Sequence, residues 1–334
     1  MTQKIKWGIL GVANIAVKKV IPAMQNGQLC EISAIASREL HRAQKAAEQL
    51  NIPKAFGSYE ELISDPDIEA IYNPLPNNLH VEWTIKAAEA GKHVLCEKPI
   101  SMTVAEATPL LATRNKTGVK IEEAFMVRTH PQWITTLNLI KEGAIGNVRA
   151  VEGHFSYNNQ DLTNIRNIRE TGGGGLMDIG CYMIFFARLI FNDEPKRVVS
   201  LIEEHPETKT DILTSALLDF PAGHATFTCS TRLVPYQRVQ ILGTAGRIEV
   251  QIPCNAPPDA ACKVFVDNGT DLGGQSIKTI EIEPCDQYTI QGDLFSRAIL
   301  ENTQPVIALE DSIKNMAVIE AVFRSAKTGR WEKP

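Results

Sequence analysis

The sequence predicts an α/β protein in two parts: an N-terminal domain around a parallel sheet, and a C-terminal α+β domain with a large, mostly antiparallel sheet. In the first third of the 334-residue chain, short apolar runs alternate with amphipathic helical stretches, which is the pattern of βαβ units. From Arg197 onward, strand-like stretches follow one another through short turns, as in hairpins. The pattern changes after Phe125, so we expect domains at residues 1–124 and 125–334.

Residues 4–42 contain the first strand, a tight turn, a helix and a second strand. The run from Ile5 to Leu10 is almost continuously apolar, as in a parallel strand buried on both faces, and it stops at Gly11. An amphipathic helix is predicted by apolar residues at i, i+3, i+4 and i+7, namely Val17, Val20, Ile21 and Met24.

The turn between this strand and helix is close to the dinucleotide fingerprint G-x-G-x-x-G/A, with Ala13 and Ala16 in the second and third small-residue positions. The free N–H groups and the positive dipole end of the helix favour a pyrophosphate there. The alternative is a small-residue turn that binds no ligand. The expected cofactor contacts are Gly11, Val12, Ala13, Asn14 and Ile15.

The end of the second strand indicates which nicotinamide cofactor fits. An Asp or Glu there would hold the ribose 2′-hydroxyl of NAD, whereas a 2′-phosphate needs a cation. The residues present are Ser37 and Arg38, with Arg42 one turn later, so we expect NADP. Glu39 stands against this interpretation, and the alternative is that the arginines form the solvated face of a helix start.

A strand at residues 70–73 ends in a segment rich in proline and asparagine that reaches His80. Open α/β sheets bind ligands at the carboxyl ends of their strands, so Asn78 and His80 are expected to face the cofactor. The alternative is that the asparagines cap the next helix and that His80 is a packing residue.

A strand at residues 93–96 leads to Glu97, Lys98 and Pro99 at the same edge. Pro99 disfavours helix at the preceding residue, so Lys98 should extend from the sheet edge. A lysine near a nicotinamide can orient a substrate hydroxyl and lower the pKa of a neighbouring acid. A surface lysine before a helix is the alternative.

In the C-terminal domain, a polar loop at residues 156–171 runs into four glycines and then into Asp178 and Tyr182. The spacing i, i+4 places these two side chains on one face of a helix, one turn apart. Tyr182 could transfer a proton while Asp178 binds or orients the substrate. The alternative is a core tyrosine and a carboxylate that is favoured by the helix dipole.

The sheet of this domain should have one face covered by the Asp178 helix and by later helices, leaving the other face for a subunit interface. We therefore expect a homodimer or homotetramer. Strands are predicted at residues 148–155, 198–202, 212–219, 225–230, 238–242 and 247–251, and closing helices at 294–300 and 313–324.

Composition narrows the class of protein. The chain is 44% hydrophobic and 22% charged with a net charge of −5, and it has no basic run with interleaved aromatic residues, so no nucleic-acid partner is expected. No leader and no apolar run of membrane-spanning length is recognised, which favours the cytoplasm. Seven separated cysteines indicate reduced, mostly buried thiols, and no metal site is expected.

Together these motifs resemble the Gfo/Idh/MocA oxidoreductase family. The resemblance rests on Gly-Ile-Leu-Gly-Val-Ala-Asn-Ile-Ala at 8 to 16, on Glu97-Lys98-Pro99, and on Gly-Gly-Gly-Leu-Met-Asp-Ile-Gly-Cys-Tyr at 173 to 182. The first turn, the stretch from Glu123 to Gln132 and Tyr182 look most like the NADP-dependent D-xylose 1-dehydrogenases and dimeric dihydrodiol dehydrogenases. Many inositol dehydrogenases instead carry histidine at the position of Tyr182.

The resemblance implies a Rossmann-type first domain and hydride transfer between C1 of an aldose and NADP, giving a lactone. Alternatives are a trans-dihydrodiol substrate, reduction of another sugar carbonyl, or a non-catalytic NADP-binding sensor. The sensor should lack one of the implied catalytic residues, Lys98, Asp178 and Tyr182, and all three are present. The resemblance also implies that Glu97 and His80 lie beside the nicotinamide and that Arg166 contacts cofactor or sugar. The residues that it implies for binding the phosphates are Gly11 to Ile15, Ser37 and Arg38.

Overall fold

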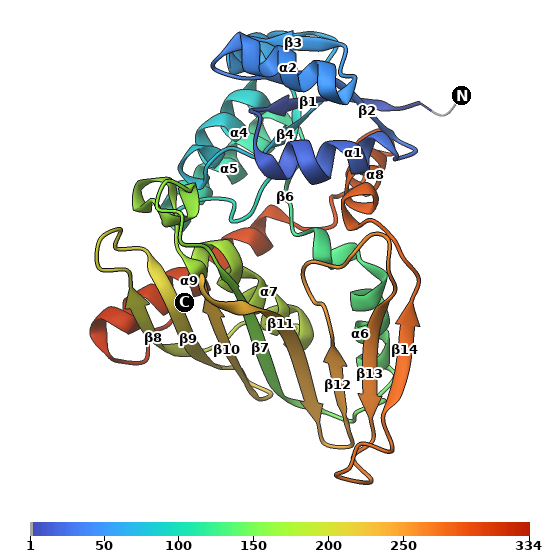
Figure 1. The fold of residues 1–334 in the computed structure, drawn as a ribbon, viewed down its shortest axis with the longest axis vertical. Coiled ribbons are helices and arrows are strands. Elements are labelled where there is room, and N and C mark those ends of the chain that lie inside the picture. Colours follow the sequence, from blue (N-terminus) through green and yellow to red (C-terminus); the bar gives the residue numbers. More distant parts are fainter. Residues whose placement is uncertain (1–2) are drawn as a thin grey trace. The chain divides into compact units, whose positions relative to one another are not determined.

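The computed structural model describes residues 3–334, which form two compact units (Figure 1). The first unit contains the chain up to Met126 and also Asp286–Ile313. The second contains Val127–Cys285 and Lys314–Pro334. The sequence predicted that residues 286–313 belong to the second domain. In the structure they belong to the first unit instead.

The sheet of the first unit is parallel throughout, and its strand order is β3-β2-β1-β4-β5-β6. This order reverses direction between β1 and β4, and the crevice outside the carboxyl ends at such a point is where open α/β sheets bind ligands. The strands are β1 (Ile5–Leu10), β2 (Cys30–Ala36), β3 (Lys54–Phe56), β4 (Ala70–Asn73), β5 (His93–Cys96) and β6 (Ile121–Glu123).

Two helices of this unit begin at capping boxes that the local sequence provides. Ser58 accepts a hydrogen bond from the backbone N–H of Glu61, and Thr103 accepts one from that of Glu106. The helical elements are η1 (Ala16–Val20), α1 (Ile21–Gln25), α2 (Leu40–Leu50), α3 (Tyr59–Ser64), η2 (Asn77–Leu79), α4 (His80–Glu89), α5 (Val104–Thr117) and α8 (Gln287–Leu300).

Helix α8 belongs to the first unit because it completes the core beside β1. The indole N–H of Trp7, a fully buried residue, donates to the hydroxyl of Ser296 at 3.1 Å, and the Trp7 ring lies 5.6 Å from that of Phe295. Asp293 accepts backbone hydrogen bonds from Gln28 and Leu29. These contacts join residues more than 260 positions apart, so local sequence patterns could not predict them.

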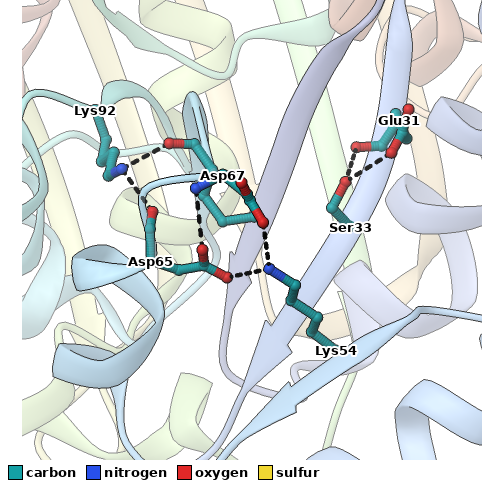
Figure 2. Close-up of polar contacts among 7 residues, drawn as sticks. Glu31, Ser33, Lys54, Asp65, Asp67 and Lys92 are labelled. Atoms are coloured by element: carbon teal, nitrogen blue, oxygen red, sulfur yellow. Dashed lines mark hydrogen bonds and ion pairs between the residues drawn. The ribbon is translucent and has the colours of Figure 1, made fainter.

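Lysines at the amino ends of β3 and β5, away from the carboxyl edge of the sheet, contact the loop that precedes β4. Lys54, at the start of β3, lies 2.8 Å from carboxylate oxygens of both Asp65 and Asp67 (Figure 2). Lys92 donates to the backbone carbonyls of Asp65 and Ile68 at 2.8 and 2.7 Å. These contacts fix the loop between α3 and β4.

The sheet of the second unit has the order β14-β13-β12-β11-β7-β10-β9-β8, and all of its pairs are antiparallel except β7 with β10. The expected fold class, with a parallel sheet followed by a large, mostly antiparallel one, is confirmed. The strands are β7 (Val148–Asn158), β8 (Arg197–Glu204), β9 (Asp211–Asp219), β10 (His224–Ser230), β11 (Arg232–Gly243), β12 (Arg247–Val250), β13 (Cys262–Asp267) and β14 (Lys278–Ile282).

The last two strands were not expected from the sequence. They form one end of the sheet, and much of β14 is exposed, so its apolar pattern is weak. The helical elements from η3 onward, apart from α8, are η3 (Met126–Thr129), α6 (Pro131–Lys141), η4 (Ile165–Asn167), η5 (Arg169–Thr171), η6 (Leu176–Gly180), α7 (Cys181–Phe191) and α9 (Leu309–Thr328), and the division between the units falls within α9.

Helices cover one face of this sheet. The Ser200 hydroxyl on β8 donates to the carbonyl of Val322 on α9 at 2.7 Å, and Gly153 on β7 packs against Met183 on α7. The segment Arg169–Phe191 is long and apolar enough to cross a membrane, but 83% of its most apolar window is buried, as expected of a core helix. The opposite face of the sheet exposes Leu201 and Val234 at 79% and 75%.

Candidate functional site

The turn after β1 has the backbone that the fingerprint requires. Gly11 has φ +86°, a conformation that favours glycine, and its N–H donates to the carbonyl of Ala36 at 2.8 Å. A Cβ on Gly11 would lie 3.1 Å from Leu75, so little space is left for a side chain. Helical backbone starts at Asn14 and includes the π-turn η1. A side-chain-free turn leading into a helix N-terminus fits a dinucleotide pyrophosphate.

The end of β2 places a cation in the same corner of the unit. The Tyr59 hydroxyl lies 3.5 Å from where a Cβ on Gly11 would be, and Arg38 lies near enough to this tyrosine to influence its pKa. Burial raises the pKa of Tyr59, while Arg38 and Arg42 oppose the rise. Glu39 lies 3.7 Å from Arg42, so its carboxylate is engaged on the helix start.

His80 does not take the place that the sequence suggested. Its side chain is fully buried, and its Nδ1 and Nε2 each lie 2.7 Å from a backbone carbonyl oxygen, of Pro99 and Leu75 respectively. Neither ring nitrogen is left for a cofactor contact, so the alternative interpretation, a packing histidine, is the one observed. Asn78 is exposed at the loop after β4.

The segment after β5 is held by several hydrogen bonds. The carboxylate of Glu97 accepts from the Tyr72 hydroxyl at 2.6 Å and from the backbone N–H of Lys98 at 3.3 Å. The Glu97 N–H donates to the carbonyl of Asn73 at 3.0 Å, and the Ile100 N–H donates to Glu123 at 2.8 Å. The Lys98–Pro99 peptide bond is cis, and Lys98 is half-buried. The backbone that carries Lys98 is therefore fixed on both sides.

In the second unit, the glycine run allows a loop and a helix start to meet closely. A Cβ on Gly173 would lie 2.6 Å from the carbonyl oxygen of Arg166, and Gly174 has φ +120°. Asp211, which is buried, accepts a 2.6 Å hydrogen bond from the backbone N–H of Leu176. Burial raises the pKa of Asp211 to about 6, although its hydrogen bonds oppose the rise. The glycines thus let the helix start approach the backbone of the preceding loop closely.

The carboxylate of Asp178 is held by two donors. Its Oδ2 accepts from the Tyr157 hydroxyl at 2.6 Å and from Nε of Arg166 at 2.9 Å. Burial and the charge of Asp178 both raise the pKa of Tyr157, which keeps that phenol a proton donor. Arg166 therefore orients the carboxylate that was predicted to contact the substrate.

Tyr182 lies one turn after Asp178, where the π-turn η6 continues into α7. It is 4% exposed, and its ring centroid lies 6.2 Å from that of Phe155 and 6.4 Å from that of Phe186. Single π-turns inside α-helices are frequent at functional sites. The same helix segment thus carries an oriented carboxylate and a tyrosine held by aromatic packing.

Several residues of these two groups were missed by the sequence reasoning. In the first unit, Tyr72 hydrogen-bonds to Glu97 and the Tyr59 hydroxyl lies beside the Gly11 turn; in the second, Tyr157 hydrogen-bonds to Asp178. Two of the three lie at or near the carboxyl end of a strand, which is a signal that could have identified them. Their hydroxyl partners depend on side-chain direction and could not be read from spacing.

The parallel sheet with its glycine turn and terminal arginine defines a dinucleotide-binding α/β protein. The chain matches the family model for oxidoreductases with an NAD-binding Rossmann fold (GFO_IDH_MocA) over residues 5–125, and the GFO/IDH/MocA C-terminal domain over 133–249. This chain belongs to the Gfo/Idh/MocA oxidoreductase family, as the motifs predicted.

Characterised relatives narrow the comparison. The chain is 37% identical to D-xylose 1-dehydrogenase (NADP(+)) 2 of Haloferax volcanii, over 97% of this chain and 98% of that one. It is 31% identical to bovine trans-1,2-dihydrobenzene-1,2-diol dehydrogenase, over 78% of each chain. The crystal structure of KijD10, a 3-ketoreductase from Actinomadura kijaniata in complex with NADP and TDP-benzene, matches with a TM-score of 0.90 and 28% identity, over 97% of this chain and 98% of that one.

Proposed function

We propose that this protein is an NADP-dependent dehydrogenase that oxidises the C1 hydroxyl of an aldose of the D-xylose type to a lactone. The observation that carries the proposal is the Asp178 carboxylate, fixed by Tyr157 and Arg166 one helical turn before the buried Tyr182. A carboxylate fixed in one orientation binds sugar hydroxyls well, and a tyrosine beside it can exchange their protons.

The preference for NADP rests on Arg38. Its guanidinium lies at the end of β2, where the 2′-position of the adenosine ribose is bound in this fold, and a planar fork of donors suits a phosphate. Gly11 and the helix that starts at Asn14 supply the turn and the N–H groups for the pyrophosphate. Bound NADP would supply the hydride acceptor.

The residues of the chain act on the substrate proton. Tyr182 takes the proton of the C1 hydroxyl, because a carbonyl can form there only if that proton leaves. Lys98 favours the tyrosinate through its positive charge and orients the same hydroxyl. Asp178 holds the neighbouring hydroxyls, and Glu97 keeps the backbone of Lys98 in place.

Reduction of NADP with pentoses, hexoses and trans-dihydrodiols, compared with reduction of NAD, tests the proposal. If an aldose gives the highest kcat/KM of these substrates, the proposed function is supported. Dihydrodiol oxidation is the second candidate, because the bovine relative is named for that activity. Highest activity with a dihydrodiol would move the substrate assignment to that class, and binding of NADP without turnover of any substrate would favour a sensor.

A further inference from the structure

The buried His80 is the conspicuous polar group that the proposed chemistry does not use. It opens helix α4, yet its ring is directed into the protein and contacts two separate loops of the first unit. Pro99 follows Lys98 directly in the chain, and Leu75 is the residue whose side chain approaches the Gly11 turn. The ring therefore connects the loop after β4 with the loop after β5.

We propose that His80 is a positioning residue that fixes the Lys98 backbone relative to the loop covering the Gly11 turn. The proposal rests on the proposed function, since it assigns to Lys98 a role in the reaction. His80 does not touch the reacting atoms. It acts through two backbone carbonyls, one beside Lys98 and one beside the cofactor turn.

The position of His80 is itself fixed by Asn73 at the end of β4. The Asn73 amide donates to the His80 carbonyl at 3.1 Å and to the Thr84 hydroxyl at 3.2 Å, and it accepts from the Leu75 N–H at 3.3 Å. A buried histidine ring held at its backbone, with each nitrogen 2.7 Å from a carbonyl oxygen, has little freedom to rotate. Movement of the Lys98 segment would separate the Pro99 carbonyl from the buried ring.

The protonation of the ring determines how strong this connection is. Both carbonyl contacts are hydrogen bonds only when both nitrogens carry protons, since a neutral imidazole has one N–H. Burial lowers the pKa of His80 to about 4; the charge of Lys98 also lowers it, whereas the carbonyls of Pro99 and Leu75 oppose the shift. The doubly protonated ring binds both loops, and the neutral ring donates to one of them.

His93 provides a matched control. It lies at the other end of β5, in the same unit, and its Nδ1 accepts a 2.9 Å hydrogen bond from the backbone N–H of Lys120. Burial lowers the pKa of His93 to about 4 as well. Replacing His93 by leucine removes a buried histidine hydrogen bond without touching the loops around Lys98.

The experiment compares His80→Leu, His80→Gln and His93→Leu with the wild-type protein by hydrogen exchange and by kinetics. In His80→Leu we expect amide exchange in residues 95–101 to rise about tenfold, and kcat to fall about tenfold. We expect the apparent pKa of the base in the pH-rate profile to rise, because a displaced Lys98 no longer favours the tyrosinate. His80→Gln keeps one hydrogen-bond donor, so its amide exchange and its kcat should lie between those of His80→Leu and those of the wild-type protein.

His93→Leu should lower the unfolding temperature but leave both the exchange of residues 95–101 and the pH-rate profile unchanged. Unchanged exchange in both His80 variants would overturn the proposal, and so would raised exchange with a wild-type pH-rate profile. If the wild-type protein oxidises no sugar or diol, the proposed function fails, and the exchange data alone decide whether His80 fixes the Lys98 segment. His80→Gln keeps the test valid if His80→Leu does not fold.

Discussion

The hydroxyl of Tyr157, near the end of β7, donates a 2.6 Å hydrogen bond to Oδ2 of Asp178, which also accepts from Arg166. Side chains from strand β7 and from the loop before the Asp178 helix thus donate to the same carboxylate oxygen, Oδ2 of Asp178. A carboxylate held by two donors keeps one orientation, and that orientation is what the proposed sugar binding requires.

Replacing Tyr157 by phenylalanine should weaken this arrangement without removing the charge of Asp178. A hydrogen bond to a charged group contributes about 1.5 to 3 kcal/mol, so kcat/KM for the sugar should fall about 10- to 100-fold. The dissociation constant of NADP should stay within threefold, roughly the scale of measurement scatter. Tyr236→Phe, on the open face of the sheet, is the control. Equal losses in both variants would contradict the assignment.

Tyr182→Phe removes the proposed base but keeps the aromatic packing with Phe155 and Phe186. We expect kcat to fall by about two to four orders of magnitude, with little change in NADP affinity. Steady-state kinetics and fluorescence titration with NADPH measure the two quantities. Wild-type turnover in this variant would mean that another group accepts the proton.

Arg38→Ala should change the cofactor preference. Loss of a charge-assisted contact to the 2′-phosphate removes about 1.5 to 3 kcal/mol from NADP binding and leaves NAD binding nearly unchanged. The ratio of kcat/KM for NADP to that for NAD should therefore fall about 10- to 100-fold. Arg42→Ala, one turn later and engaged with Glu39, should change the ratio less. A preference of the wild-type protein for NAD would refute this prediction.

Glu122 should make stability depend on pH. Burial raises the pKa of Glu122 to about 8 from an ordinary value of 4.5, against the hydrogen bonds from Ile307 and Val306. The folded state thus binds the Glu122 proton more tightly than the unfolded state does. The contribution of this proton to the free energy of unfolding is therefore fully present below pH 4.5 and is lost as the pH rises through 8. Urea unfolding of wild type and Glu122→Gln from pH 5 to 9 should show the variant gaining relative stability with pH. If the two proteins differed in free energy of unfolding by the same amount at every pH, the assignment to Glu122 would be wrong.

The open face of the second sheet should bury itself against another copy of the chain. Leu201, Val234 and Tyr236 are exposed there at 79%, 75% and 46%. We expect at least a dimer by light scattering, and dissociation in Val234→Glu. Ile134→Glu, on helix α6, introduces the same charge at a residue with 46% exposure and should leave the dimer intact. A wild-type monomer at micromolar concentration would rule out the interface.

Local sequence determined the features that depend on periodicity and on backbone chemistry. The apolar run before Gly11 predicted a buried parallel strand, the glycine predicted the turn, and the alternation after Arg197 predicted the large sheet. The chain positions of Asp178 and Tyr182 on one helical segment also follow from spacing alone. These signals lie within a few residues of one another, so the sequence displays them directly.

Tertiary structure decided which distant groups meet. The placement of residues 286–313 with the first unit depends on contacts between Trp7 and Ser296, and the orientation of Asp178 depends on Tyr157. His80 was expected to face the cofactor because of its place after β4, but both of its ring nitrogens lie 2.7 Å from backbone carbonyl oxygens. A hydrogen bond depends on side-chain direction in the packed fold, which spacing along the chain does not encode.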